Sequence, residues 1–307
     1  MNYTELIDPE LKKNARTVPF NRFITATGNI YQGAAWHLSK CPPEIKKEVI
    51  VTEGYQGLPL KTSIFSPKDA EGSLPALIYA HGGAFAYKPS AYHKKLACIY
   101  AQKAGCRVFF THYHLSPRYQ YPAAYEDVLS LYRYVTEHAE ELGVEADRIG
   151  IAGDSAGASL AALVCSRYKE ENVKMPLFQM LVYPFTDGNM ETDSMKQFTD
   201  TPLWNSQYME NMWTYYCGED RALRSQAAPM HCPLPDVIPD TYIETAQYDC
   251  LHDEGILYGE KLKKAGAEVM INDTTGTYHG YDIVTDAQIV KDNVKKRLSF
   301  LQRKFNL

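Results

Sequence analysis

Short apolar runs alternate with amphipathic runs along most of this chain, and this alternation limits the fold more than any other feature. Strands are predicted over 75–80, 106–113, 148–153, 177–184, 241–247 and 268–273. Helices are predicted between and after them, near 91–104, 125–138, 158–171, 253–265 and 286–304. Apolar strands that alternate with helices imply a mostly parallel sheet with helices on both faces. We therefore predict an α/β fold.

Three segments stand apart from this pattern. Residues 45–66 contain two strand-like runs separated by a turn-rich stretch, which predicts an antiparallel hairpin. Residues 1–44 and 185–235 do not continue the alternation, and they carry all three tryptophans. They suit either a cap folded over a site or plain surface insertions. A chain of 307 residues without a low-complexity linker favours one domain over 1–307, with the cap from about 1–44 and 185–235.

Charge and cysteine content exclude several classes of function. The net charge of -5 leaves no basic footprint for nucleic acid and no polybasic patch for a membrane surface. The N-terminus lacks a basic region followed by an apolar core, and no apolar run reaches the length of a spanning helix. Seven scattered cysteines, an odd count without CxxC pairs, argue against a full disulfide framework. A cytoplasmic enzyme is the expectation.

The segment Gly153-Asp154-Ser155-Ala156-Gly157 lies directly between a predicted strand and a predicted helix. A G-x-S-x-G in this context is the pattern of the nucleophile elbow of α/β-hydrolases. The serine occupies a strained turn, and the flanking glycines let neighbouring backbone approach without Cβ clashes. The N–H groups that begin the following helix favour developing negative charge nearby. Ser155 is the predicted nucleophile.

A second motif, His81-Gly82-Gly83-Ala84-Phe85, follows the strand at 75–80. Adjacent glycines allow backbone N–H groups to point into a cleft. Taken alone, the glycine pair would indicate an ordinary turn, but its position upstream of the serine motif favours a role in binding the oxyanion. The N–H groups of Gly82, Gly83 and Ala156 are the predicted oxyanion hole.

Two further residues complete a triad in the order Ser, Asp, His. Asp249 is the first carboxylate after the strand at 241–247, with Asp253 and Glu254 as nearby rivals. Asp253 suits the first turn of a helix, so Asp249 is preferred. His279 lies on a Gly-flanked loop after the last predicted strand, and among nine histidines it alone fits the chain order. We predict that Asp249 orients His279 and that His279 is the general base.

These motifs together resemble a known family. HGGAF, HLSPRYQYPAAYEDV (114–128), GDSAG, YDCLHDEG and YHGYD, in this order, are similar to the hormone-sensitive lipase-like (bacterial family IV) carboxylesterases of the α/β-hydrolase superfamily, over residues 75–284. The resemblance implies the α/β-hydrolase fold with a helical cap, and it assigns Ser155, Asp249 and His279 to the triad. Ala84 departs from a common third glycine, and His114 stands where an arginine is frequent.

The resemblance and the chemistry predict a serine carboxylesterase for short acyl chains, acetyl to butyryl, that needs no metal or organic cofactor. Its partner is a small-molecule ester, with neither nucleic acid nor membrane, and a homodimer through the strand at 268–273 is expected by family analogy. Two alternatives stay open. One is a ligand-binding homologue that has lost hydrolysis, and the other is a lactone or peptide hydrolase with the same triad.

Overall fold

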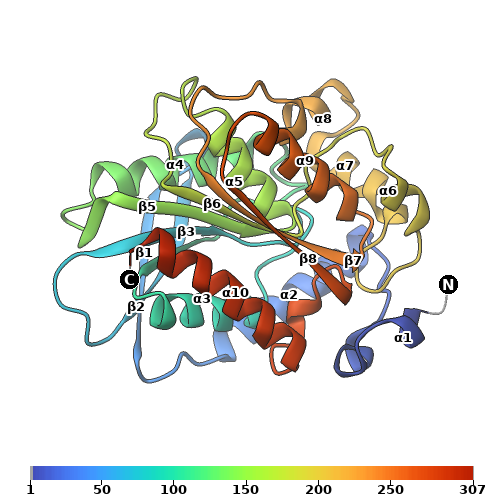
Figure 1. The fold of residues 1–307 in the computed structure, drawn as a ribbon, viewed down its shortest axis with the longest axis horizontal. Coiled ribbons are helices and arrows are strands. Elements are labelled where there is room, and N and C mark those ends of the chain that lie inside the picture. The colour runs from blue at the N-terminus through green and yellow to red at the C-terminus, as the bar shows by residue number, and fades with distance from the viewer. Residues whose placement is uncertain (1–2, 307) are drawn as a thin grey trace.

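A computed structural model describes residues 3–306 of the protein. Eight strands form one sheet in the order β1-β2-β4-β3-β5-β6-β7-β8 (Figure 1). Their bounds are β1 Ile45–Glu53, β2 Pro59–Pro67, β3 Leu74–Ala80, β4 Arg107–Thr111, β5 Val144–Asp154, β6 Phe178–Val182, β7 Asp240–Tyr248 and β8 Val269–Tyr278. The β1–β2 and β2–β4 pairs are antiparallel, and every pair from β4 to β8 is parallel. The predicted hairpin and the mostly parallel sheet are confirmed.

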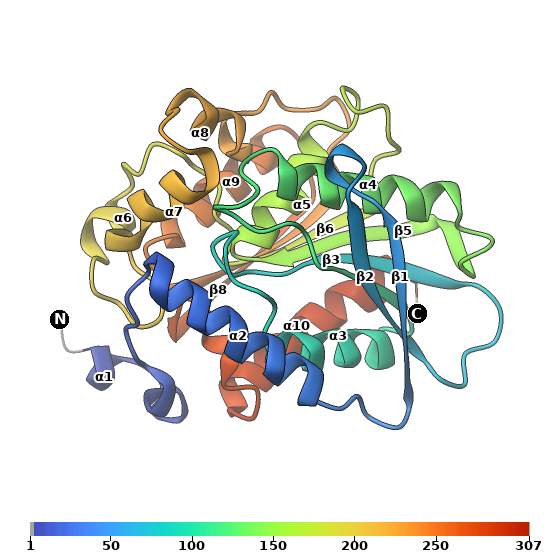
Figure 2. The same ribbon diagram turned by 180° about the vertical axis from the view of Figure 1, so that it is seen from behind.

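Helices cover both faces of the sheet. Helices α3 and α10 lie on one face, and α4, α5 and α9 lie on the other (Figures 1 and 2). Their bounds are α3 Ala91–Lys103, α4 Ala123–Glu137, α5 Ala156–Ser166, α9 His252–Lys264 and α10 Gln288–Lys304. The central strands β3 and β6 are almost completely buried because helices cover them on both sides.

Two segments outside this alternation lie against each other. The N-terminal one contains α1 Tyr3–Leu6, η1 Pro9–Asn14 and α2 Arg22–Leu38, and the insertion after β6 contains α6 Asp193–Gln197, η3 Ser206–Tyr208, α7 Met209–Cys217, α8 Ala222–Gln226 and η4 Pro229–His231. The N–H of Leu203 donates to the carbonyl of Arg16 at 2.8 Å, and the Asn211 amide donates to the carbonyl of Phe20 at 3.2 Å. Segments 187 to 191 residues apart at these contacts therefore form one structure beside the sheet.

The ends of several elements differ from the sequence prediction. Helix α5 stops at Ser166 instead of 171, and the polar residues that follow form turns. Strand β8 runs past 273 to Tyr278, because Tyr278 pairs with Tyr248 beyond a register shift. Within the insertion, the short 3₁₀ turn η3 directly precedes α7.

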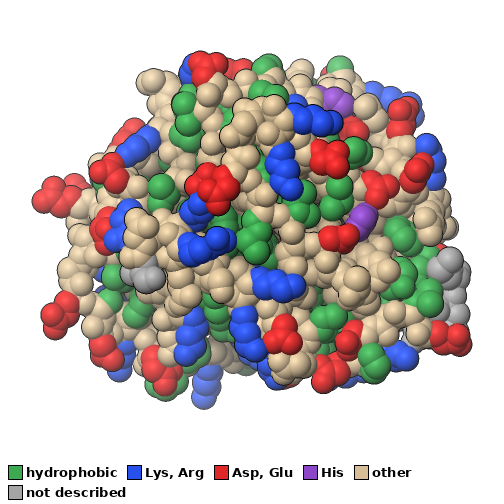
Figure 3. Space-filling model, in the orientation of Figure 1, with side chains coloured by type: hydrophobic (Ala, Val, Ile, Leu, Met, Phe, Trp, Pro, Cys, Tyr) green, Lys and Arg blue, Asp and Glu red, His purple; other side chains and the backbone are tan. Residues whose placement is uncertain are grey.

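The surface carries both signs of charge. Lysine and arginine side chains alternate with acidic ones over the face in Figure 3, with apolar side chains between them. Within residues 3–306, none of the helices combines the length and apolar character needed to cross a bilayer.

Candidate active site

Ser155 occupies the sharp turn between β5 and α5. Its backbone has φ of 52° and ψ of -121°, a region that L-residues rarely adopt. The Ser155 N–H donates to the carbonyl of Val182 at the end of β6, at 2.9 Å. Gly157 must be glycine here, because a Cβ would overlap the backbone of Ala80 and His81. The close approach of α5 to β3 thus fixes the strained turn and its hydroxyl.

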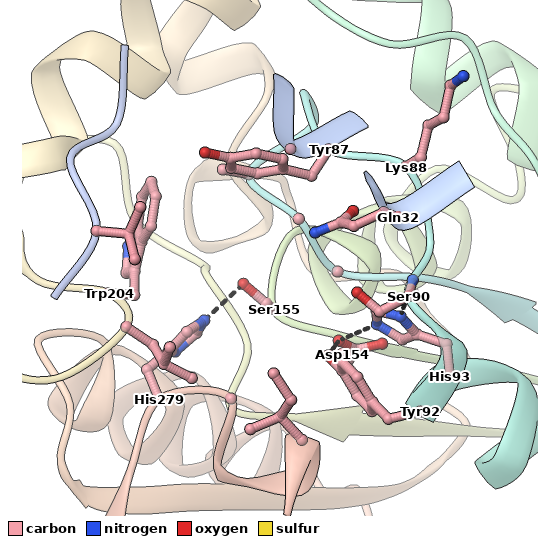
Figure 4. Close-up of a pocket in the computed structure, with 18 of the residues that line it drawn as sticks. Gln32, Tyr87, Lys88, Ser90, Tyr92, His93, Asp154, Ser155, Trp204 and His279 are labelled. Carbon is pink, nitrogen blue, oxygen red and sulfur yellow. Dashed lines mark hydrogen bonds and ion pairs between the residues drawn. The ribbon is translucent and has the colours of Figure 1, made fainter. Parts of the chain in front are cut away.

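His279 and Asp249 meet Ser155 in one hydrogen-bonded line. Figure 4 shows the part of this line between His279 and Ser155. His279 Nε2 lies 2.8 Å from Ser155 Oγ, and His279 Nδ1 lies 2.7 Å from Asp249 Oδ2. Asp249 follows β7 and is fully buried, while His279 follows β8 and is 7% exposed. Because the carboxylate accepts from Nδ1–H, Nε2 is left to accept from the Ser155 hydroxyl. The three predicted triad residues are brought together.

The two rival carboxylates lie elsewhere. Asp253 is in the first turn of α9, as expected, where it accepts from the N–H of Ser194 at 2.8 Å and contacts His252. Glu254 is buried and accepts from the N–H groups of Thr186 and Asp187, both at 2.9 Å. Burial raises the pKa of Glu254 to about 8. Both carboxylates tie α9 to the insertion, and His279 is bonded to neither.

The loop after β3 brings Gly82 and Gly83 next to the elbow, because Ala80 of β3 pairs with Gly153 of β5. Among the described residues, no backbone or side-chain hydrogen bond uses the N–H of Gly82 or Gly83. Gly83 has φ of 127°, and its carbonyl accepts from the N–H of Ala86 and of Tyr87. Ala84, at the position of the common third glycine, also has a positive φ, 52°. A glycine would relieve strain there.

Asp154, next to the serine, is held by residues that the sequence analysis missed. Its carboxylate accepts from the Tyr79 hydroxyl at 2.8 Å and from His93 Nε2 at 3.2 Å. His93 Nδ1 accepts from the N–H of Ser90 at 2.9 Å, so Nε2 carries the proton. Burial raises the pKa of Asp154, but His93 and Tyr79 outweigh it and lower the pKa to about 2. A buried anion therefore lies beside the elbow.

A buried ionic cluster supports the loop that carries His279. Arg297 of α10 contacts the carboxylates of Glu244 in β7 and Asp282 in the short turn η5 Tyr281–Ile283. Asp282 also accepts from the Tyr183 hydroxyl at 3.2 Å, and the Tyr183 ring lies 4.8 Å from the His279 ring. All members of the cluster are nearly inaccessible to solvent. The cluster connects the last helix to the position of the imidazole.

Two cavities meet at Ser155, and Trp204 borders both. The larger has a volume of about 390 Å³ and is lined by His279, Gly280 and aromatic side chains that include Phe20, Tyr87 and Tyr92 (Figure 4). The smaller has a volume of about 10 Å³ and is lined by Ala84, Phe85, Ala156, Phe185, Met209, Met212 and Leu251. Both the N-terminal segment and the insertion contribute walls, so the two non-alternating parts of the chain border the site.

The tryptophans, His114 and the cysteines differ in how they lie relative to the two cavities and the triad. Of the three tryptophans, only Trp204 borders these cavities, whereas Trp36 packs on Phe110 and Trp213 packs on Phe185. His114 contacts the buried carboxylate of Asp127 at 2.8 Å, away from the triad. Among residues 3–306, no three His, Cys, Asp or Glu side chains come together as a metal site. The cysteines of the described chain are unpaired, and all but Cys41 are buried.

Comparison with known proteins agrees with this architecture. The family profile described as the alpha/beta hydrolase fold matches residues 77–283. Esterase LipI of Mycobacterium tuberculosis is 33% identical over 284 residues, which cover 90% of this chain and 88% of that protein. Ethyl acetate hydrolase of Pseudomonas putida is 29% identical over 230 residues, 73% of this chain and 72% of that protein. The solved structure of a bacterial heroin esterase superimposes with a TM-score of 0.90 at 30% identity, over 99% of each chain. The chain therefore belongs to the α/β-hydrolase fold family and, within it, to the hormone-sensitive lipase-like carboxylesterases.

Proposed function

We propose that this protein is a serine carboxylesterase that hydrolyses short-chain acyl esters, acetyl to butyryl, through an acyl-enzyme on Ser155. The observation that carries the proposal is the line of hydrogen bonds from Asp249 through His279 to Ser155, with 2.7 and 2.8 Å between the bonded atoms. This is the geometry that activates a serine hydroxyl.

Each group has one role in the proposed reaction. His279 Nε2 takes the hydroxyl proton as Ser155 Oγ bonds to the ester carbonyl carbon. The same imidazole gives that proton to the leaving alcohol oxygen as the carbon–oxygen bond breaks. Water then attacks the acyl-enzyme with His279 again as base, and the proton returns to Ser155 Oγ as the acid leaves. Asp249 keeps the imidazole in the required tautomer and stabilises its protonated form.

The oxyanion is proposed to bind to the N–H groups of Gly82, Gly83 and Ala156. The first two lie in the loop after β3 and make no other hydrogen bond within the described chain, and Ala156 begins α5, whose N-terminus favours negative charge. Loss of one such donor typically costs on the order of a hundredfold or more in kcat. Residues 1–44 and 185–235 are proposed to act as the cap over this site.

The preference for short acyl chains is supported by the smaller cavity. A volume of about 10 Å³ holds roughly one water molecule, and its walls are almost entirely apolar. An acetyl methyl group is close to a water molecule in size and fits this space, a butyryl chain requires the walls to move apart, and a palmitoyl chain is far longer than the cavity.

A fluorophosphonate probe and an ester panel test the proposal. Wild-type protein is expected to take up the probe and to hydrolyse acetyl and butyryl nitrophenyl esters much faster than the palmitoyl ester. Ser155→Ala should lose labelling and turnover. Ser166→Ala, also on α5 but bonded to the carbonyl of Ala162, is the matched control and should keep both. Labelling that survives in Ser155→Ala, or a palmitoyl preference, would contradict the proposal.

A further inference from the structure

The outward face of helix α2 is apolar, whereas the outward face of a surface helix normally carries charge. Residues 23–38 contain no Asp, Glu, Lys or Arg, although α2 lies on the outside of the molecule and crosses its front in Figure 2. We infer that this face, together with the basic residues at the two ends of α2, docks the protein on an anionic lipid bilayer. Binding to a bilayer goes beyond the hydrolysis proposed above and does not depend on it.

The exposed apolar side chains form one stripe along the helix. Phe23, Ile30, Tyr31 and Leu38 are 74–79% exposed. Residues seven, eight and fifteen positions after Phe23 lie on the same side of the helix as Phe23, because about 3.6 residues make one turn. Apart from Tyr31, these four residues line neither cavity at Ser155. The other exposed positions between 23 and 38 are Ala26, Thr27, Ala34 and His37.

The opposite side of α2 attaches the helix to the protein largely through polar and small residues. The Asn29 side chain accepts from the N–H of Lys88 at 2.6 Å and donates to the carbonyl of Ala86 at 2.9 Å. Gly28 lies so close to the Tyr87 ring that an added Cβ would be 2.9 Å from it. A helix on a water-exposed surface normally has the reverse arrangement, with its apolar side inward. The outward side of α2 therefore has the composition of a face that contacts an apolar phase.

The charge near the stripe is of one sign over a long stretch of the chain. Residues 11–43 contain five basic side chains and no Asp or Glu, although acidic residues outnumber basic ones by 37 to 32 in the whole chain. Lys40, Lys94 and Lys95 line a groove between α2 and α3, where Lys95 Nζ pairs with Asp286 at 2.7 Å. The net charge of -5 gives no reason to expect a membrane partner, because this sum hides the basic segment. The five basic residues are Lys12, Lys13, Arg16, Arg22 and Lys40.

An anionic bilayer suits this surface better than a second copy of the chain does. In a symmetric contact through α2, the same basic side chains of both copies would approach one another, and like charges oppose such a contact. Anionic headgroups instead attract these side chains. The 17 residues of α2 extend about 25 Å, so the stripe can lie flat in the interface with its apolar side chains below the headgroups. Val18 and Tyr31 are exposed and also line the large cavity, so docking brings an edge of that cavity to the bilayer.

Sedimentation with lipid vesicles tests the docking surface without any ester. Wild-type protein is expected to bind vesicles of equal parts phosphatidylglycerol and phosphatidylcholine about tenfold or more tightly than vesicles of phosphatidylcholine alone. Added salt should weaken this binding, because it screens exposed charges. Equal binding to the two kinds of vesicle, or binding to neither, would overturn the inference.

Variants locate the binding on α2. The double variant Ile30→Glu/Leu38→Glu should weaken binding to the anionic vesicles about tenfold or more, because two carboxylates replace side chains that enter the apolar layer. Lys40→Glu should weaken it about fivefold or more. Leu257→Glu and Lys263→Glu, at exposed positions of α9 on the other face of the sheet, are the matched controls and should bind as the wild type does. Thermal unfolding checks that each variant is folded.

The outcomes separate this inference from the proposed function. Ser155→Ala should bind vesicles as the wild type does, and a protein that binds vesicles but hydrolyses no ester defeats only the proposed function. A folded Ile30→Glu/Leu38→Glu variant that binds as tightly as the wild type defeats the docking surface. Wild-type dimers that the same double variant dissociates, without vesicle binding, would assign this face to a second copy instead. The comparison of the two kinds of vesicle uses only the wild type, so it decides the question even where a variant fails to fold.

Discussion

At the scale of single residues, the carboxylate of Asp249 holds the His279 imidazole through a hydrogen bond to Nδ1. One carboxylate oxygen faces His279 Nδ1, and the other accepts from the N–H of Leu251 at 2.9 Å. These contacts fix the carboxylate, so the proton of His279 stays on Nδ1. An asparagine at this position fits the space but offers an N–H as well as a carbonyl, which allows the wrong tautomer.

We therefore expect Asp249→Asn to lower kcat by about 10³- to 10⁴-fold with little change in KM or in folding. Steady-state kinetics on a nitrophenyl acetate would measure this. Asp253→Asn is the matched control, since Asp253 is a carboxylate four residues later that contacts His252 and Ser194 instead. If Asp249→Asn keeps more than about a tenth of the wild-type kcat, Asp249 does not hold the proposed role.

The three residues of the proposed triad, which the structure brings together, could be selected from the sequence because each follows a recognisable strand in a known chain order. The residues around Asp154 could not. His93 and Tyr79 lie 61 and 75 residues earlier in the chain, on α3 and β3, and only the folded sheet brings them to the carboxylate. No sequence pattern around His93 indicates a role near the serine. Its position three residues after Ser90 is, however, the spacing at which a side chain can cap the first turn of a helix.

At the scale of secondary structure, α2 contains two glycines with different surroundings. A Cβ at Gly33 would lie 3.7 Å from the nearest atoms of Lys88, an ordinary contact with a flexible side chain. A Cβ at Gly28 would lie 2.9 Å from the Tyr87 ring, which borders the large cavity. One glycine is thus replaceable, and the other lets the helix approach the site.

Gly33→Ala should stabilise the protein by about 0.5–1 kcal/mol, because alanine favours the helix and restricts the unfolded chain. Gly28→Ala should gain less or lose stability, and it should change turnover of bulky esters by moving Tyr87. Thermal unfolding of both variants, with kinetics on the acetate of a bulky alcohol, tests this pair. If Gly28→Ala stabilises the protein as much as Gly33→Ala does and leaves the kinetics unchanged, the Tyr87 ring moves away from the added methyl group without cost.

Whether each central element is a strand or a helix could be predicted from the sequence, whereas its first and last residues could not. Helices cover both faces of β3, of β6 and of the second half of β5, so these stretches are mostly apolar and stand out in the sequence. Strand β8 is at the edge of the sheet, and its extension to Tyr278 depends on pairing with Tyr248. Pairing partners of this kind are not visible in a single sequence.

At the scale of the whole molecule, some buried titratable groups lower the free energy of unfolding at acidic pH, and another lowers it at alkaline pH. The pKa of His81 and that of His112 are both lowered to about 3, chiefly by burial. In the unfolded chain both residues bind protons below about pH 6.5, so stability falls as the pH drops from there toward 3. The pKa of Glu254 is raised to about 8, so the folded protein keeps a proton that the unfolded chain releases above about pH 4.5. Stability from this group is lost as the pH rises toward 8.

We expect the free energy of unfolding to be highest near about pH 6 and to fall on both sides. Glu254→Gln should flatten the alkaline side, a difference on the order of a few kcal/mol between about pH 6 and pH 9. Urea unfolding across this range measures it. Glu260→Gln, at an exposed position of the same helix α9, should leave the profile as it is. An unchanged alkaline slope in Glu254→Gln would mean that the carboxyl is ionised in the folded state.

The contact between the N-terminal segment and the insertion was only partly predictable. Their failure to continue the strand–helix alternation is visible in the sequence, but the pairing of Leu203 with Arg16 is not, because neither segment has a periodic pattern that specifies a partner. The cytoplasmic location and a homodimer through the edge strand β8 stay predictions.

The cluster at Arg297 has a consequence for the order in which the enzyme is made. Glu244, His279 and Asp282 are synthesised before Arg297. The nascent chain therefore contains all the proposed catalytic residues while the carboxylates of Glu244 and Asp282 still lack the guanidinium that pairs with them. Until α10 docks, hydration of those acids opposes closure of the loop that bears the imidazole. We therefore expect the protein to hydrolyse esters only once α10 has docked. Hydrolysis by a chain that ends at residue 287, before α10, would contradict this.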